Sequence, residues 1–147
     1  WLVMRGTRTL AARLRLHEAH ALEVAAWLQQ QTAVATVFCP ALPTHPGHEI
    51  WQRDCVGTNG LLSIELQQGI ETAQVDAFID SLKVFGLGAS WGGYESLVTA
   101  ANMRRVRSVT DWSARGAVVR LHIGLEDPAD LIADLEQGFA VLGSERA

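Results

Sequence analysis

The fold is decided by the pattern of Val118-Val119-Arg120-Leu121-His122-Ile123-Gly124-Leu125. Apolar side chains recur at every second position from Val119 to Leu125, which is the period of a strand with one buried face. Arg120 and His122 share the opposite face. A guanidinium is costly to bury unless a carboxylate or phosphate pairs with its fork of donors. Arg120 is therefore a candidate anion ligand, although a solvated strand face or an internal ion pair would also explain it.

A second informative segment is the glycine-flanked run Gly88-Ala89-Ser90-Trp91-Gly92-Gly93. Glycines allow sharp turns and a close approach of the backbone to a ligand. Ser90 adds a hydroxyl and Trp91 a large amphipathic wall, so both are candidate ligand-binding residues. The spacing matches neither a dinucleotide fingerprint nor a Walker loop. A tight turn between a strand and a helix is the alternative explanation.

Helices and strands alternate along the rest of the chain. Apolar spacings of three, four and seven predict helices, and two-residue alternation or short β-branched runs predict strands. Asp127 and Pro128 are typical of a helix start, and Gly143 of a helix end. The predicted helices are 9–31, 72–82, 94–105 and 128–142; the predicted strands are 34–38, 60–66, 83–87 and 118–125; and 40–54 is a predicted loop. We therefore expect an α+β fold of two layers, in which helices cover one face of a small, mostly antiparallel sheet.

Composition limits the classes of protein to which the chain can belong. With 147 residues, 48% of them hydrophobic, residues 1–147 can form one domain with a substantial core. The net charge of −4 argues against nucleic acid as a partner, and no apolar run is long enough to span a membrane. Two cysteines and the lack of a recognisable signal peptide favour a cytoplasmic setting. A start at Trp1 rather than methionine suggests a piece of a longer protein.

Two other groups of residues could carry chemistry. His45, His48 and Glu49 include metal-binding residue types, but the intervening Pro46 and Gly47 break the helical register of a His-Glu-x-x-His site. A structural loop with a capping histidine is favoured, and we expect no metal site. Cys39 and Cys55 lack a Cys-x-x-Cys spacing, so they are interpreted as packed or unreactive thiols.

Several motifs, in order along the chain, resemble the Cys/Met-metabolism family of pyridoxal-phosphate enzymes. They are Met4 to Leu10, Pro40 to Glu49, Ser90-Trp91-Gly92-Gly93-Tyr94-Glu95-Ser96-Leu97, and Arg120 to Asp127. Within that family, Trp91 and His122 are typical of the β-lyases, whereas γ-synthases and γ-lyases usually carry leucine and serine there. A Met-Thr-His segment common outside the β-lyases is also missing. The resemblance therefore favours a β-lyase.

The resemblance implies the C-terminal domain of a fold-type I enzyme, with helix 9–31 joining it to a missing cofactor domain. Arg120 would bind the α-carboxylate of an amino-acid substrate, with Ser90 and Trp91 completing the pocket. Pyridoxal 5'-phosphate would be bound mainly by the missing domain, which also carries the Schiff-base lysine. Lys83 lies in no matching motif, so no catalytic or cofactor-binding residue is expected in this chain, which should be inactive alone. The family also implies a homotetramer.

The activity implied for the complete protein is β cleavage of L-cystathionine to homocysteine, pyruvate and ammonia, within transsulfuration and methionine biosynthesis. The alternatives in the same family are a cystathionine γ-lyase, a γ-synthase and a cysteine-S-conjugate β-lyase. An alternative from another class is a domain that binds amino acids without catalysis.

Overall fold

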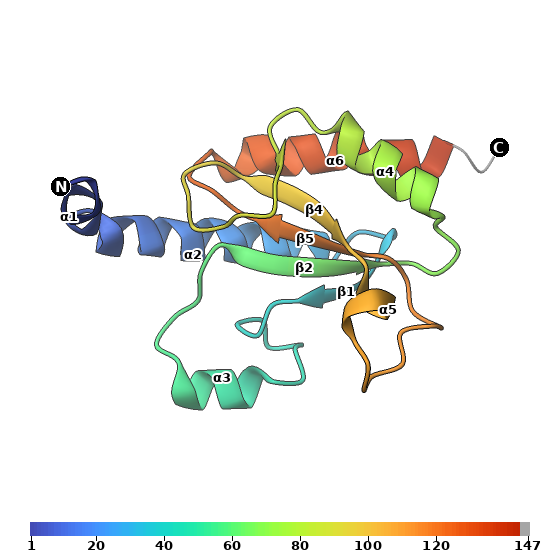
Figure 1. Cartoon of the computed structure of the whole chain (residues 1–147), viewed down its shortest axis with the longest axis horizontal. Coiled ribbons are helices and arrows are strands. Elements are labelled where there is room, and N and C mark those ends of the chain that lie inside the picture. The colour runs from blue at the N-terminus through green and yellow to red at the C-terminus, as the bar shows by residue number, and fades with distance from the viewer. Residues whose placement is uncertain (145–147) are drawn as a thin grey trace.

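The computed structural model describes residues 1–144 and is built on a five-stranded sheet. The central strand β5 (Val118–His122) pairs antiparallel with β2 (Leu61–Leu66) on one side and with β4 (Leu97–Ala101) on the other. β1 (Val34–Phe38) pairs antiparallel with β2, and the short β3 (Gly86–Leu87) pairs parallel with β4. The resulting order is β1-β2-β5-β4-β3, which confirms the expected small and mostly antiparallel sheet (Figure 1).

Three long helices pack together and against the sheet. They are α2 (Leu10–Leu28), α4 (Thr72–Ser81) and α6 (Pro128–Ser144). Figure 1 shows α4 and α6 side by side along the sheet, and Phe78 of α4 stacks on Phe139 of α6 with ring centroids 5.1 Å apart. Within residues 1–144, no helix combines the length and the apolar composition needed to cross a membrane.

The alternation of side chains along the strands separates the core from the opposite face. Leu62, Ile64, Val119 and Leu121 are fully or almost fully buried and belong to the same apolar cluster as residues of the three helices. Register places Arg120 between Ser63 of β2 and Thr99 of β4. A polar row therefore crosses the face of the sheet opposite the core.

The ends of the elements agree with the sequence in part. Thr9 precedes α2, as expected, but the helix ends at Leu28 rather than residue 31. Helix α4 begins at Thr72, as expected, and its start is fixed by a capping box between Glu71 and Gln74, but it ends at Ser81. At α6 the Asp127 Oδ1 accepts the Ala129 N–H at 2.9 Å, as expected of a cap, but the helix continues through Gly143 to Ser144.

The predicted helix 94–105 is wrong. The segment forms β4 followed by the short helix α5 (Met103–Val106). Leu97, Val98 and Ala101 fit a helical stripe locally, but the segment lies between β5 and β3 and takes the hydrogen bonds of both neighbours. Val98 is buried in the core from this strand. Tertiary pairing therefore overrides the local periodicity.

Two helices lie where none was predicted. α1 (Leu2–Thr7) precedes the long α2, and α3 (His48–Asp54) lies within the predicted loop 40–54. At the start of α3 the His48 Nδ1–H donates to the Pro40 carbonyl oxygen at 3.0 Å, and its ring stacks on Trp51. These contacts order a turn of helix that the proline- and glycine-containing sequence does not indicate.

The approach to β3 is fixed by a carboxylate that the sequence did not reveal. Asp134 of α6 is buried and accepts the backbone N–H groups of Lys83 and Val84 at 2.8 Å and of Phe85 at 3.1 Å. Because these donors point to Asp134 rather than to a neighbouring strand, β3 is shorter than the predicted strand 83–87. Asp134 thus sets the position from which the glycine-rich loop begins.

Replacing Asp134 with alanine should lower the free energy of unfolding by about 2 to 3 kcal/mol, because three amide donors lose a charged acceptor. Chemical denaturation measures the change. Glu136→Ala, at an exposed position of the same helix, is the control and should change stability by less than about 0.5 kcal/mol. Equal effects of the two substitutions would contradict this role of Asp134.

Candidate functional site

Arg120 lies at the middle of the central strand with small neighbours on both sides. Ser63 and Thr99, which have short side chains, flank it across the sheet. The side chain is half-buried, and its Nη2 donates a hydrogen bond to the backbone oxygen of Ala89. Arg120 forms no ion pair with any residue of the described part of the chain, so an internal ion pair does not account for it.

The loop that carries Ser90 and Trp91 lies against this arginine. The loop leaves β3 at Gly88, whose N–H donates to the Val98 carbonyl at 3.1 Å, and Ala89 then accepts from Arg120. Ser90 is exposed, and Trp91 has 61% of its surface exposed. The structure therefore brings the three candidate residues into one region, with Ser90 directly following the residue that Arg120 holds.

His122 contacts the same loop two residues further along β5. It is only 2% exposed, and its Nε2 lies 3.1 Å from the Gly92 nitrogen and 3.1 Å from the Gly93 oxygen. Burial lowers the pKa of His122, and the nearby charges of His17 and Arg120 act in the same direction. The hydrogen bond to Gly93 and the charge of Glu126 oppose this shift only in part. Neutral imidazole is favoured near neutral pH.

The far end of the loop is fixed to the segment that follows β5. Ser96 is buried; its N–H and Oγ–H donate to the two carboxylate oxygens of Glu126 at 2.8 and 2.7 Å, and its Oγ accepts the Gly124 N–H at 2.8 Å. A Cβ at Gly124 would lie 2.3 Å from the Tyr94 oxygen, so only glycine allows this approach. Sequence reasoning gave Ser96, Gly124 and Glu126 no role, although all three lie within the recognised motifs.

The remaining candidates shape other parts of the structure. The His45 Nδ1 accepts the N–H of Gly47, which caps α3, at 3.0 Å, so His45 orders this turn as expected. Over residues 1–144 there is no group of three or more His, Cys, Asp or Glu side chains placed to hold a metal ion. Cys39 and Cys55 are both free, and burial raises the pKa of the Cys39 thiol.

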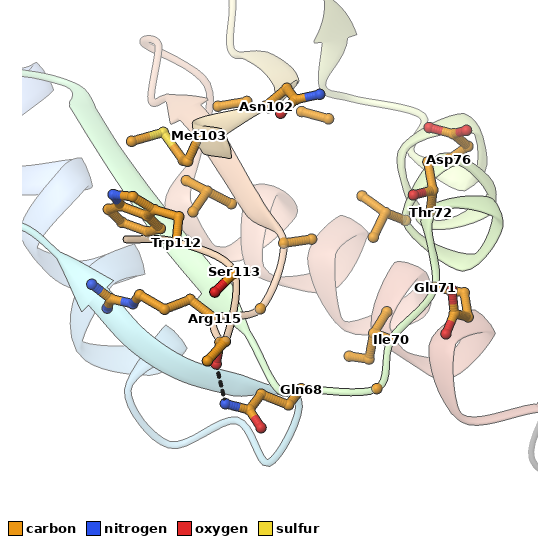
Figure 2. A pocket seen from close by; sticks show the side chains of 18 residues that line it. Gln68, Ile70, Glu71, Thr72, Asp76, Asn102, Met103, Trp112, Ser113 and Arg115 are labelled. Atoms are coloured by element: carbon orange, nitrogen blue, oxygen red, sulfur yellow. Dashed lines mark hydrogen bonds between the residues drawn. The ribbon is translucent and has the colours of Figure 1, made fainter. Parts of the chain in front are cut away.

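A cavity of about 510 Å³ lies beyond the other end of β5, next to Val118, and none of Ser90, Trp91 and Arg120 lines it. Figure 2 shows that its walls come from the segments around Gln68 to Asp76, Asn102 and Trp112 to Arg115. The Arg115 guanidinium is already engaged, because it pairs with Glu65 and lies 4.3 Å from the Trp112 ring centre. The cavity is therefore separate from the Arg120 site.

Comparison with known proteins places this geometry in a family. The model of the Cys/Met metabolism PLP-dependent enzymes matches residues 1–140. The chain belongs to this family. Cystathionine beta-lyase of Bordetella avium is 47% identical over 140 residues, which are 95% of this chain and 35% of that protein. The L-alanine/L-glutamate racemase of Wolbachia pipientis wMel is 41% identical over 143 residues, which are 97% of this chain and 36% of that protein.

A solved structure resembles this chain in fold as well as in sequence. Cystathionine gamma synthase from Xanthomonas oryzae pv. oryzae superposes with a TM-score of 0.81 and 36% identity, over 97% of this chain and 38% of that one. The chain thus spans about 35% of the length of the curated relatives it matches. The family and the α+β fold agree with the expectations from the sequence.

The family name implies pyridoxal phosphate, but the residues of this chain do not fit a complete site for it. A Schiff-base lysine is activated by burial or by a neighbouring cation. Lys83, the one lysine in the sequence, has an exposed side chain, and its backbone N–H is bound by Asp134 of α6. Lys83 is therefore part of the turn before β3 and is not suited to hold the cofactor.

Gly92 has φ of +83°, a conformation that costs a residue with a side chain about 1 to 2 kcal/mol. Gly92→Ala should therefore lower the free energy of unfolding by about 1 kcal/mol. Gly93→Ala is the matched control, because a Cβ there meets no atom within 4 Å and φ is not positive. Denaturant unfolding of both variants measures the difference, and equal losses would show that the backbone of Gly92 is not constrained.

The lowered pKa of His122 predicts a pH dependence of stability. The unfolded chain binds this proton more tightly than the folded protein does. The contribution to stability is therefore complete above the unfolded pKa of about 6.5 and is lost as the pH falls towards the folded value. Thermal unfolding between pH 7.5 and 5.5 should show a smaller decline for His122→Gln than for the unsubstituted protein. Parallel curves for the two proteins would contradict the prediction.

Proposed function

We propose that this chain is the substrate-carboxylate-binding part of a pyridoxal-phosphate-dependent carbon–sulfur β-lyase that acts on L-cystathionine. The observation that carries the proposal is the Arg120 guanidinium. It is half-buried, has no carboxylate partner in the described structure, and lies beside a loop with an exposed serine and tryptophan. A planar fork of donors that no carboxylate of the described residues engages is suited to bidentate capture of a carboxylate.

The residues of this chain would bind and orient the substrate. Arg120 would hold the α-carboxylate, and the Ser90 hydroxyl, which has no hydrogen bond within residues 1–144, would donate to the same group. Trp91 would form a wall that excludes water from one side. Holding the carboxylate restricts rotation of the amino acid about its Cα, and this restriction decides which bond is presented for reaction.

The remaining parts of the reaction would be supplied by a longer protein of which this chain is about 35%, judged from its relatives. Pyridoxal phosphate would be held mainly outside this chain, in agreement with the poor fit of Lys83, and helix α2 would join the two parts. L-Cystathionine and water would give homocysteine, pyruvate and ammonia. The setting proposed from the family resemblance is transsulfuration in the cytoplasm by a homotetramer.

The β-lyase is favoured over other activities because a relative with 47% identity carries that name, against 41% for the racemase and 36% for the γ-synthase structure. Trp91 and His122 support the same choice through the β-lyase motifs. These relatives nevertheless carry the names of several different reactions. A domain that only binds amino acids remains the alternative from another class.

Product analysis of the full-length protein with L-cystathionine tests the proposal. Homocysteine and pyruvate in equal amounts are expected. Cysteine with 2-oxobutyrate would identify γ cleavage, appearance of a D-amino acid from L-alanine or L-glutamate would identify a racemase, and absence of any turnover would support a binding domain. Each of these results would overturn the β-lyase.

Arg120→Leu in the full-length protein should raise KM for L-cystathionine at least about a hundredfold, since a charge-assisted pair worth about 3 kcal/mol is lost. The absorbance of bound cofactor should be unchanged. Arg53→Leu is the control, because the Arg53 side chain is 72% exposed and, among residues 1–144, pairs only with the adjacent Asp54. Loss of cofactor absorbance on Arg120→Leu would show that Arg120 serves the cofactor rather than the substrate.

A further inference from the structure

We propose that His122 is a positioning residue that fixes the turn at Gly92 and Gly93, and thereby sets where Ser90 and Trp91 stand relative to Arg120. The proposal rests on the proposed function, because it treats Ser90, Trp91 and Arg120 as the parts of one binding site. It adds a residue that itself touches no substrate.

The hydrogen bonds of the loop support this role. In the part of the chain that the structure describes, His122 is the only group hydrogen-bonded to the backbone of residues 90–93. Its Nε2 lies 3.1 Å from both the Gly92 nitrogen and the Gly93 oxygen. A neutral imidazole can accept from Gly92 or donate to Gly93, according to its tautomer. Either tautomer leaves one hydrogen bond on this turn.

Packing does not provide a substitute for that hydrogen bond. A Cβ built on Gly92 or on Gly93 meets no atom within 4 Å, so no packing contact restrains the turn on the side where a side chain would lie. Trp91 is mostly exposed and is not held by the core. Two adjacent glycines are also the residues with the greatest backbone freedom. Without His122 the turn would have many conformations open to it.

The imidazole is itself held rigidly. Its ring lies 5.3 Å from the ring of His17, and a Cβ on Gly60 would come within 3.0 Å of it. The backbone of His122 is in register with Leu61 of β2 and with Leu97 of β4. Because Arg120 is two residues away on the same strand, the ring and the guanidinium keep a fixed relation. Through its hydrogen bond, His122 therefore fixes the position of the turn at Gly92 and Gly93 relative to Arg120.

The alternative is that His122 only fills space in the protein interior. His17 provides a matched control, because it is also 2% exposed and its Nδ1–H donates to the backbone oxygen of Ile123 at 2.8 Å. It has no hydrogen bond to residues 88–93 in the described structure. Damage to a buried histidine in general would appear in variants of both residues.

The experiment uses the full-length protein with cofactor and the variants His122→Asn, His122→Gln and His17→Gln. Glutamine places a polar atom near the position of Nε2, whereas asparagine reaches only as far as Nδ1. Hydrogen exchange of the 88–96 segment is followed by mass spectrometry. The dissociation constant of L-alanine, which has an α-carboxylate but no leaving group, is measured by calorimetry.

We expect His122→Asn to speed exchange in the 88–96 segment and to weaken L-alanine binding about tenfold, the equivalent of one hydrogen bond. KM for L-cystathionine should rise with a smaller change in kcat. His122→Gln should restore both readouts to within about threefold. His17→Gln should lower the melting temperature with smaller changes in both readouts than His122→Asn, because His17 reaches the loop only through its contact with the His122 ring.

Two results would overturn the proposal. In the first, His122→Asn and His17→Gln change exchange and affinity equally at equal loss of melting temperature. In the second, exchange in the 88–96 segment rises in His122→Asn while L-alanine affinity stays unchanged. Failure of the unsubstituted protein to bind L-alanine, or equal binding by Arg120→Leu, would instead overturn the proposed function. The exchange data would then still decide whether His122 holds the loop.

If His122→Asn does not fold, pH takes its place as the perturbation. Protonated His122 cannot accept from Gly92, although it can still donate to Gly93. The titratable and charged groups that face it are His17 of α2, Glu126 beyond β5 and Arg120. Exchange of the Gly92 N–H, corrected for its intrinsic pH dependence, should therefore rise below about pH 6 in the unsubstituted protein and not in His122→Gln. The same rise in both proteins would overturn the proposal.

Discussion

The register of β5 between β2 and β4 is the constraint on which the rest of this structure depends. Successive side chains of a strand point to opposite faces, so one register determines two things together. Val119 and Leu121 enter the core formed with the helices, while Arg120 and His122 emerge on the other face. A slip of one residue would drive a guanidinium into an apolar core. The register of β5 with β2 and β4 therefore determines both which side chains stabilise the core and which lie on the face that carries Arg120.

The same segment also determines the shape of the loop 88–96, which carries Ser90 and Trp91. Arg120 holds Ala89, His122 contacts the turn of two glycines, and Glu126 binds Ser96 at the far end. The near end depends instead on Asp134 of α6, which fixes the backbone before β3. Every one of these contacts joins residues about thirty or more positions apart in the chain. The loop is thus ordered by the tertiary structure rather than by its own sequence.

Those distances explain what could be predicted from the sequence. Alternation over 118–125 was enough to predict β5 and the shared face of Arg120 and His122, because that information is local, although the strand ends at His122 rather than at residue 125. Helix 94–105 was a wrong prediction, because Leu97, Val98 and Ala101 fit a helical stripe and only pairing with β5 and β3 decides otherwise. Asp134, Ser96 and Glu126 carry no local signal. Arg120, Ser90 and Trp91 became specific candidates through the ordered motifs rather than through their residue types.

The open surroundings of the two-glycine turn have a consequence for how proteins of this architecture can diversify. Ser90 and Trp91 are exposed, and no side chain between residues 89 and 93 enters the core. Substitutions of Ser90 and Trp91 leave the interior intact, whereas the residues that fix the path of the loop lie elsewhere. The side chains of this segment can therefore change while the sheet and helices that support it stay the same. Selection can alter the side chains that the loop presents at Ser90 and Trp91 without rebuilding the domain, and the same property makes these two positions the natural place to randomise in directed evolution.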